Sequence, residues 1–177
     1  MEQTVKLENG HYEIALPWKM YPPSLQRNRA VVERRLGLLT KRLKREPMVH
    51  EKYKEFIGDL LNKDYARKVR CLEPRPLGTH WYLPHHPVFN PQKPGRIRVV
   101  FDCSAKHRGT SLNDQLLQGQ DLTNSLVGVL SRFRQELIAL MSDVEAMFHQ
   151  VRVRPSDCDA LRFLWWPDGN LEDQPQE

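Results

Sequence analysis

The chain contains neither a long apolar run nor a recognisable secretory leader. Across its 177 residues, no stretch approaches the roughly 20 apolar residues that a membrane-spanning helix requires. Its first residues, Met1 to Gln3, lack the basic and apolar regions of a signal peptide. We therefore expect an intracellular protein, in the cytoplasm or the nucleus, with no membrane partner.

Cysteine is also scarce. The sequence has three cysteines, at wide spacings: Cys71, Cys103 and Cys158. An odd number of widely spaced cysteines favours free thiols in a reducing compartment over a disulfide framework. Several histidines lie among the first two cysteines, but no C-x-x-C or H-x-x-x-H pair could hold a metal tetrahedrally. The sequence does not favour a zinc site.

Basic residues are plentiful. Lysine and arginine number 27 against 22 acidic residues, for a net charge of +5. Many of them crowd one expected helix: Arg27, Arg29, Arg34, Arg35, Lys41, Arg42, Lys44 and Arg45. Most such runs are solvated helix faces, whereas a continuous basic track can also bind a phosphate backbone and release its counterions. Charge alone favours the solvated face.

The first part of the chain predicts a short strand and two helices. Residues 12–16 are strand-like and end at Pro17. Apolar residues then recur at helical spacing from an N-cap at Ser24 as far as Pro47, and a second periodic segment follows from Val49. The two helices are expected to form a hairpin across the break at Pro47.

The second part predicts mainly strands. Residues 81–89 and 96–102 read as a β-hairpin, and Asp121 is expected to cap a third helix that ends near Phe133. Residues 137–141 form a continuous apolar run that predicts a strand covered on both faces. Residues 161–166 predict another strand, followed by a turn after which no returning partner strand is visible.

Four ordered blocks of sequence carry a resemblance to a known family. They are Trp81 to Phe89, Arg96 to Lys106, Ser111 to Asp114, and Ser142 to Val151. Together they resemble the reverse transcriptase region of Pao/BEL long-terminal-repeat retrotransposon polyproteins. The resemblance extends from about residue 7 to residue 166, because the helical region also resembles the segment that precedes the polymerase in those polyproteins.

The resemblance implies an α+β fold, namely a partial right-hand polymerase preceded by a helical segment. Residues 1–72 correspond to the upstream helical segment, residues 73–135 to a fingers-like subdomain, and residues 136–177 to the start of the palm. The implied parent function is RNA-directed DNA synthesis, with a primer–template nucleic acid and deoxynucleoside triphosphates as partners.

The resemblance also assigns roles to residues of the first palm motif. Asp143 matches the catalytic aspartate that binds Mg²⁺, the cofactor of such polymerases, and the backbone carbonyl of Val144 would add a second ligand. Hard divalent cations prefer such oxygen ligands. Phe148 matches the side chain that crowds the ribose 2′-hydroxyl and so selects deoxynucleotides, although by itself it would be an ordinary core aromatic.

Basic and polar residues of the finger region complete the predicted site. Arg98 matches the arginine that contacts the triphosphate, for which a forked, permanently charged donor is suited. Lys93 is its companion, with Arg96 as a competitor for the same role. Asn113 matches a residue near template and primer, whereas Asp102 is expected to be a structural partner within the fingers.

One departure limits the expected activity. The paired aspartates of the family's later palm motif have no counterpart, and Asp157 and Asp159 are poor substitutes. Because one carboxylate would hold the metal ions weakly, we expect a fragment of a reverse transcriptase that is inactive by itself. The alternatives are a non-catalytic nucleic-acid-binding or interaction protein derived from such an element, and a reading frame with no function.

Overall fold

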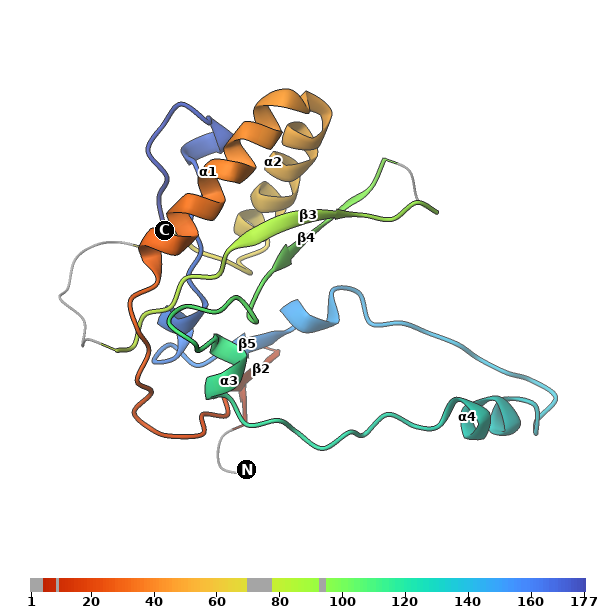
Figure 1. Ribbon diagram of the computed structural model, residues 1–177. Coiled ribbons are helices and arrows are strands. Elements are labelled where there is room, and N and C mark those ends of the chain that lie inside the picture. The colour runs from red at the N-terminus through yellow and green to blue at the C-terminus, as the bar shows by residue number, and fades with distance from the viewer. Residues whose placement is uncertain (1–4, 9, 70–77, 93–94) are drawn as a thin grey trace.

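The computed structural model describes residues 5–8, 10–69, 78–92 and 95–177, and it has a mixed α+β fold (Figure 1). The predicted α+β class is confirmed. The helices are α1 (Arg29–Arg45), α2 (Pro47–Asn62), α3 (Leu112–Gln115) and α4 (Leu126–Phe133). The strands are β1 (Lys6–Glu8), β2 (His11–Ile14), β3 (His85–Phe89), β4 (Ile97–Phe101) and β5 (Val151–Val153). Short 3₁₀ turns cover Met147–His149, Cys158–Leu161 and Pro167–Gly169.

The predicted helical hairpin is confirmed, with Pro47 at the start of α2. The two helices bury their apolar faces in one core, to which α1 contributes Val32, Leu36, Leu39 and Leu43. The predicted N-cap at Ser24 is wrong, because α1 begins at Arg29. Asn28 precedes it but does not cap it: its Nδ2 donates to the carbonyl oxygen of Tyr82 at 2.7 Å. The backbone N–H of Tyr82 donates to Asn28 Oδ1 at 2.9 Å.

The predicted β-hairpin is also confirmed. Strands β3 and β4 pair antiparallel, with His85 opposite Phe101 and Phe89 opposite Ile97. The hairpin lies below the helical hairpin in Figure 1, and Val99 of β4 joins the core formed by α1 and α2. The helices and the hairpin therefore form two packed layers.

A small sheet connects sequence-distant parts of the chain. Strand β2 pairs antiparallel with β1 and parallel with β5, so the strand order of this sheet is β1-β2-β5. The main core likewise draws residues from all three predicted segments, among them Leu43, Val99 and Leu164. The segment boundaries at residues 72/73 and 135/136 remain predictions from the resemblance, whereas the packing crosses both of them.

The predicted strand at residues 161–166 is wrong, and among the described residues only isolated bridges join this segment to other parts of the chain. Arg162 makes an isolated parallel bridge with Tyr82, and Trp165 makes an isolated antiparallel bridge with Gln176. The Trp165 N–H donates to the Gln176 carbonyl at 2.9 Å, and the Gln176 N–H returns the bond at 2.7 Å. The polar end of the chain thus folds back onto this segment.

An ionic cluster fixes that return. The Glu177 carboxylate accepts from Arg29 Nη1 at 2.5 Å, from the Tyr82 hydroxyl at 2.8 Å and from Arg162 Nη1. The Arg162 guanidinium also binds Asp159 Oδ1 through Nε at 3.0 Å and Nη2 at 2.8 Å. Both arginines and both carboxylates are therefore satisfied in a mostly buried setting, which such charges require. The cluster holds the start of α1 against the C-terminal segment.

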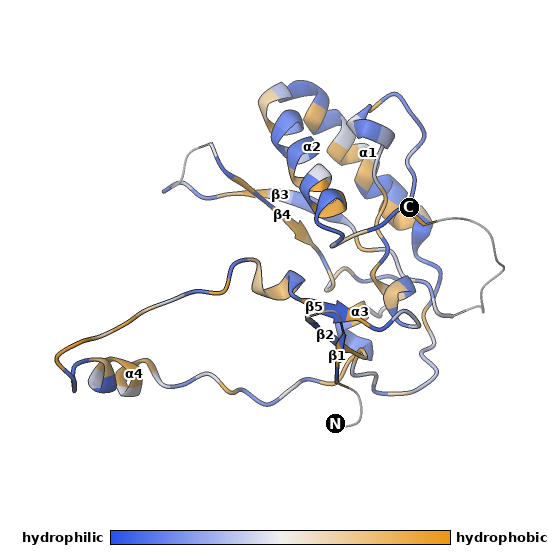
Figure 2. Ribbon diagram, turned by 180° about the vertical axis from the view of Figure 1, so that it is seen from behind, coloured by the Kyte–Doolittle hydropathy of each residue, from blue (hydrophilic) through white to orange (hydrophobic). Residues whose placement is uncertain are grey.

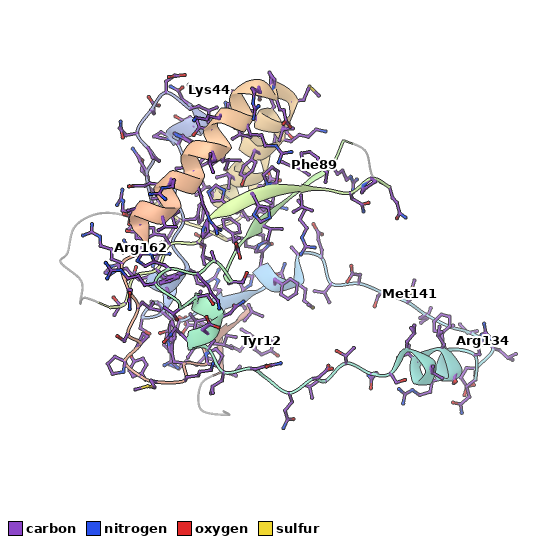
Figure 3. All side chains as sticks on the ribbon, viewed as in Figure 1. Tyr12, Lys44, Phe89, Arg134, Met141 and Arg162 are labelled. Atoms are coloured by element: carbon purple, nitrogen blue, oxygen red, sulfur yellow. The ribbon has the colours of Figure 1, made fainter. Side chains whose placement is uncertain are left out.

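Residues 117–145, here called the apolar arm, leave the body of the protein as an extended excursion (Figures 1 and 2). The predicted strand at residues 137–141 is wrong: the segment has no regular structure, and Leu137, Leu140 and Met141 are 105%, 90% and 91% exposed. No described strand lies beside it, so its backbone groups have no ladder partners and its side chains no cover. Figure 3 shows Met141 and Arg134 projecting far from the core.

Helix α4 within the arm differs from its prediction as well. The helix begins after Ser125, so Asp121 does not cap it. The Asp121 side chain instead accepts from the Thr123 N–H at 2.9 Å in a local turn. None of its residues is buried. Over the described ranges, no helix is long and apolar enough to cross a membrane.

Candidate nucleic-acid interface

The β3–β4 hairpin exposes one face because side chains alternate along a strand. His85, Pro87 and Val99 point toward the core and are buried. Arg98 lies opposite Val88 on the other face, and both side chains are exposed. Within the ranges that the structure describes, no carboxylate lies within ion-pair distance of Arg98 or Arg96. Their charges are available to an anion.

The far end of the hairpin is braced by the helices. Lys52 of α2 donates from Nζ to the carbonyl oxygen of Gly95, and the Arg42 guanidinium lies 5.1 Å from the centre of the Phe89 ring. Phe89 is labelled in Figure 3. These contacts fix the backbone on both sides of the turn, so that Arg96 and Arg98 start from a positioned strand. Lys93, the predicted companion of Arg98, lies outside the described residues.

Asp102 fixes the other end of β4 and has a structural role, but its partners extend beyond the fingers-like segment to α1. Its Oδ1 accepts from the Ser104 N–H at 3.1 Å and the Ser104 hydroxyl at 2.6 Å, while Oδ2 accepts from Arg35 Nη1 at 3.1 Å. Partial burial acts to raise the pKa of Asp102, but the bonds from Ser104 and Arg35 outweigh it and lower that pKa. The ionised carboxylate ties α1 to the loop after β4.

Asn113 lies exposed in the short helix α3, close to the end of β4 in the chain. The Ser111 hydroxyl and the Asp114 carboxylate form a capping box that starts this helix. The Asn113 N–H donates to the carbonyl of Cys103 at 3.1 Å, which fixes α3 against the preceding loop. The Asn113 side chain is therefore presented to solvent from a defined backbone.

The first palm motif is arranged differently from the finger residues. Asp143 and Val144 lie in the exposed arm, where Asp143 Oδ1 accepts from the N–H of Val144 at 2.9 Å. Phe148 belongs to the 3₁₀ turn Met147–His149 and is 79% exposed. Among the parts of the chain that are described, no hydrogen bond or ion pair joins Asp143 to Arg98 or Asn113.

The predicted Mg²⁺ ligands do not fit a metal site in this arrangement. Magnesium requires several oxygens in near-octahedral positions held around one point. Asp143 stands on an extended, solvated segment, and no group of three or more metal-ligating side chains occurs among the described residues. The assignment of Mg²⁺ to Asp143 and Val144 therefore rests on the resemblance alone.

The 3₁₀ turn within this motif is anchored to the segment that follows α2. The His149 ring stacks on Tyr65 with centroids 4.9 Å apart, and Gln150 Nε2 donates to the Tyr65 hydroxyl at 3.3 Å. The arm therefore rejoins the body immediately before β5, and Phe148 is placed next to the rejoining point.

A buried hydrogen-bond chain, which sequence reasoning missed, lies under the hairpin. His85 Nε2 bonds the carbonyl oxygen of Leu164 at 2.8 Å, and His85 Nδ1 lies 2.5 Å from the Tyr53 hydroxyl. Because a carbonyl only accepts, Nε2 carries the proton and Nδ1 accepts from Tyr53. Burial lowers the pKa of His85 to about 4, and burial raises the pKa of Tyr53. The chain joins α2, β3 and the C-terminal segment.

Asp157, set aside as a poor catalytic substitute, also has a structural role. Its carboxylate accepts from the backbone N–H of Leu16 at 2.9 Å and from Trp18 Nε1 at 3.2 Å. The partners are about 140 positions away in the sequence, so no local spacing signals the contact. Asp157 thus helps to hold the segment after β2 against the segment after β5.

Comparisons with known proteins add no identification: no family model, no curated protein and no solved structure matches the chain.

Proposed function

We propose that this chain is part of a retrotransposon reverse transcriptase and that it binds a primer–template through the exposed face of the β3–β4 hairpin. The observation that carries the proposal is the placement of Arg98, a solvent-facing guanidinium with no carboxylate partner in the described ranges, on a hairpin braced by α1 and α2. A positioned, unneutralised guanidinium suits phosphate oxygens. The four sequence blocks that resemble the family support the same proposal.

The chain is proposed to bind without polymerising by itself. Asp143 is solvated on the apolar arm, and the described residues provide no metal-ligating group around it. This arrangement favours the second candidate function, a non-catalytic nucleic-acid-binding protein derived from such an element. The two candidates share the binding surface and differ only in whether chemistry follows.

The test compares Arg98→Gln with the matched control Arg152→Gln, which removes the same charge from an exposed position on β5. Fluorescence anisotropy would measure the affinity for a DNA primer annealed to an RNA template. A charge-assisted hydrogen bond contributes about 1.5 kcal/mol or more, so Arg98→Gln should weaken binding by about tenfold, whereas Arg152→Gln should leave it nearly unchanged. Equal effects of both substitutions would contradict the proposed surface.

Primer extension in the same samples separates the two candidates. Incorporation of deoxynucleotides that is abolished by Asp143→Asn would assign polymerase activity to this chain. Binding without incorporation would support the non-catalytic candidate. Absence of binding by the unaltered protein at low salt would reject both.

A further inference from the structure

Helix α1 has a second charged surface that the proposed hairpin site does not use. Its buried residues Val32, Leu36, Leu39 and Leu43 define the inner side of the helix. At about 100° per residue, Arg34, Lys41 and Arg45 fall within about 40° of one another on the opposite side. All three side chains are exposed. These residues are here called the α1 stripe.

The stripe is distinguished from the other cations of α1 by its lack of acidic partners. Arg29 and Arg42 pair with Glu33 and Glu46 at 2.8 and 3.2 Å. Arg35 and Lys44 pair with Asp102 and Glu172 at 3.1 and 2.6 Å. Of the carboxylates in the described ranges, none lies within ion-pair distance of the stripe. The flanks of α1 are neutralised, whereas its outer side keeps its positive charge.

Geometry separates the stripe from the hairpin site. The inner side of α1 and the inner face of β3–β4 share one core, so their solvent faces point away from each other across the two layers. Lys44, labelled in Figure 3, marks the end of α1 to which the stripe runs. A nucleic acid on the hairpin face does not cover the stripe.

We propose that the α1 stripe is a second nucleic-acid contact, which binds the phosphate backbone without reading sequence. The inference rests on the proposed function, because it takes nucleic acid as the partner. At about 1.5 Å per residue, the stripe extends about 16 Å, comparable to roughly five phosphates of one duplex strand at about 3.4 Å each. Its occupant is a polyanion of regular charge spacing.

The burial of α1 argues against an anionic membrane as the occupant. An interfacial helix inserts an apolar face between lipids. The large apolar residues of α1 are packed against α2 and the hairpin, except for Leu38, which lies beside the stripe at 62% exposure. The face offered to a partner is cationic, which suits a phosphodiester chain.

The test uses two triple variants of equal charge. One replaces the stripe (Arg34→Gln, Lys41→Gln, Arg45→Gln), and the control replaces three exposed cations beyond α2 (Lys63→Gln, Arg67→Gln, Lys68→Gln). Affinity for the primed template would be measured from about 50 to about 200 mM salt. Losing three phosphate contacts lowers the salt slope by about 2.7, so the affinity of the unaltered protein should fall about 40-fold more over this range than that of the stripe variant.

Several outcomes decide the inference. Retention of the full slope by the stripe variant, or the same loss in the control variant, would overturn it while leaving the hairpin site intact. If Arg98→Gln weakens binding but the stripe variant keeps the full salt slope, the hairpin site stands and the stripe is not a contact. Absence of binding by the unaltered protein would instead reject the proposed function. Stripe-dependent binding to phosphatidylserine vesicles, with none to nucleic acid, would assign the surface to membranes.

Two controls keep the result interpretable. Thermal unfolding of each variant should match that of the unaltered protein, because every substituted side chain is exposed. A charge-conserving variant, Arg34→Lys with Arg45→Lys, should keep the full salt slope of the unaltered protein. A reduced salt slope in this variant would contradict binding to the phosphate backbone by charge alone.

Discussion

His85 lies in the core with both ring nitrogens hydrogen-bonded and only 7% of its surface exposed. Protonation would place a charge there and remove the lone pair that accepts from Tyr53. Burial accordingly lowers the pKa of His85 to about 4 from its ordinary 6.5. The residue therefore makes the fold sensitive to acid.

The stability of the protein should therefore fall in acid. Since the folded pKa lies below the unfolded one, the unfolded chain binds the proton first as the pH falls. The free energy of unfolding should be greatest above about pH 6.5 and should lose about 3 kcal/mol by pH 4. Urea unfolding at a series of pH values would measure it.

The control for this prediction is the neighbouring His86, which is exposed. His86→Gln should keep the pH dependence of the unfolding free energy, whereas His85→Gln should reduce it over pH 4 to 6.5 and lower stability at neutral pH. An unchanged pH dependence in His85→Gln would show that other groups cause the acid sensitivity.

At the scale of elements, α1 is a helix with one structural side and one free side. A second prediction compares two leucines of this helix. Leu43→Ala removes a side chain that is 1% exposed and should cost about 2 to 5 kcal/mol of unfolding free energy. Leu38→Ala removes an exposed leucine and should change the unfolding free energy by no more than about 0.5 kcal/mol. Equal losses in chemical denaturation would contradict the assigned orientation of α1.

The apolar arm is the element with the least tertiary support. We predict that limited proteolysis cleaves first between residues 117 and 145, because extended and exposed backbone enters a protease readily. Mass spectrometry would locate the cuts. The body should persist as two associated fragments, since β5 pairs with β2 and the Glu177 cluster binds Arg29. First cuts inside α1 or α2 would contradict this prediction.

Sequence reasoning succeeded where local pattern suffices. Helical periodicity with Pro47, and alternating residues around a turn, identified the two hairpins. It failed at residues 137–141, because an apolar run predicts a strand only if neighbours cover it. It also missed the return of Gln176 to Trp165 and the His85 chain, whose partners are distant in sequence. Of the candidate site, the resemblance proposed Arg98, and the structure shows that its side chain is exposed on β4.

At the scale of the whole molecule, the chain combines a well-packed body with two outward cationic surfaces and an apolar arm. The body is held by contacts between its beginning and its end, such as Asp157 to Leu16 and Glu177 to Arg29. Asp143 and Val144, which resemble catalytic residues, lie on the arm, whereas Arg98 and Asn113 lie on the body. Nucleic-acid binding is therefore the activity that we propose for the body.

The most direct test of nucleic-acid binding is a titration of the unaltered protein with a primed RNA template at about 50 and about 200 mM salt. We predict clear binding at the lower salt and an affinity that falls steeply as salt rises, because arginine and lysine displace counterions from phosphates. Absence of binding at low salt would contradict it, as would an affinity that does not depend on salt.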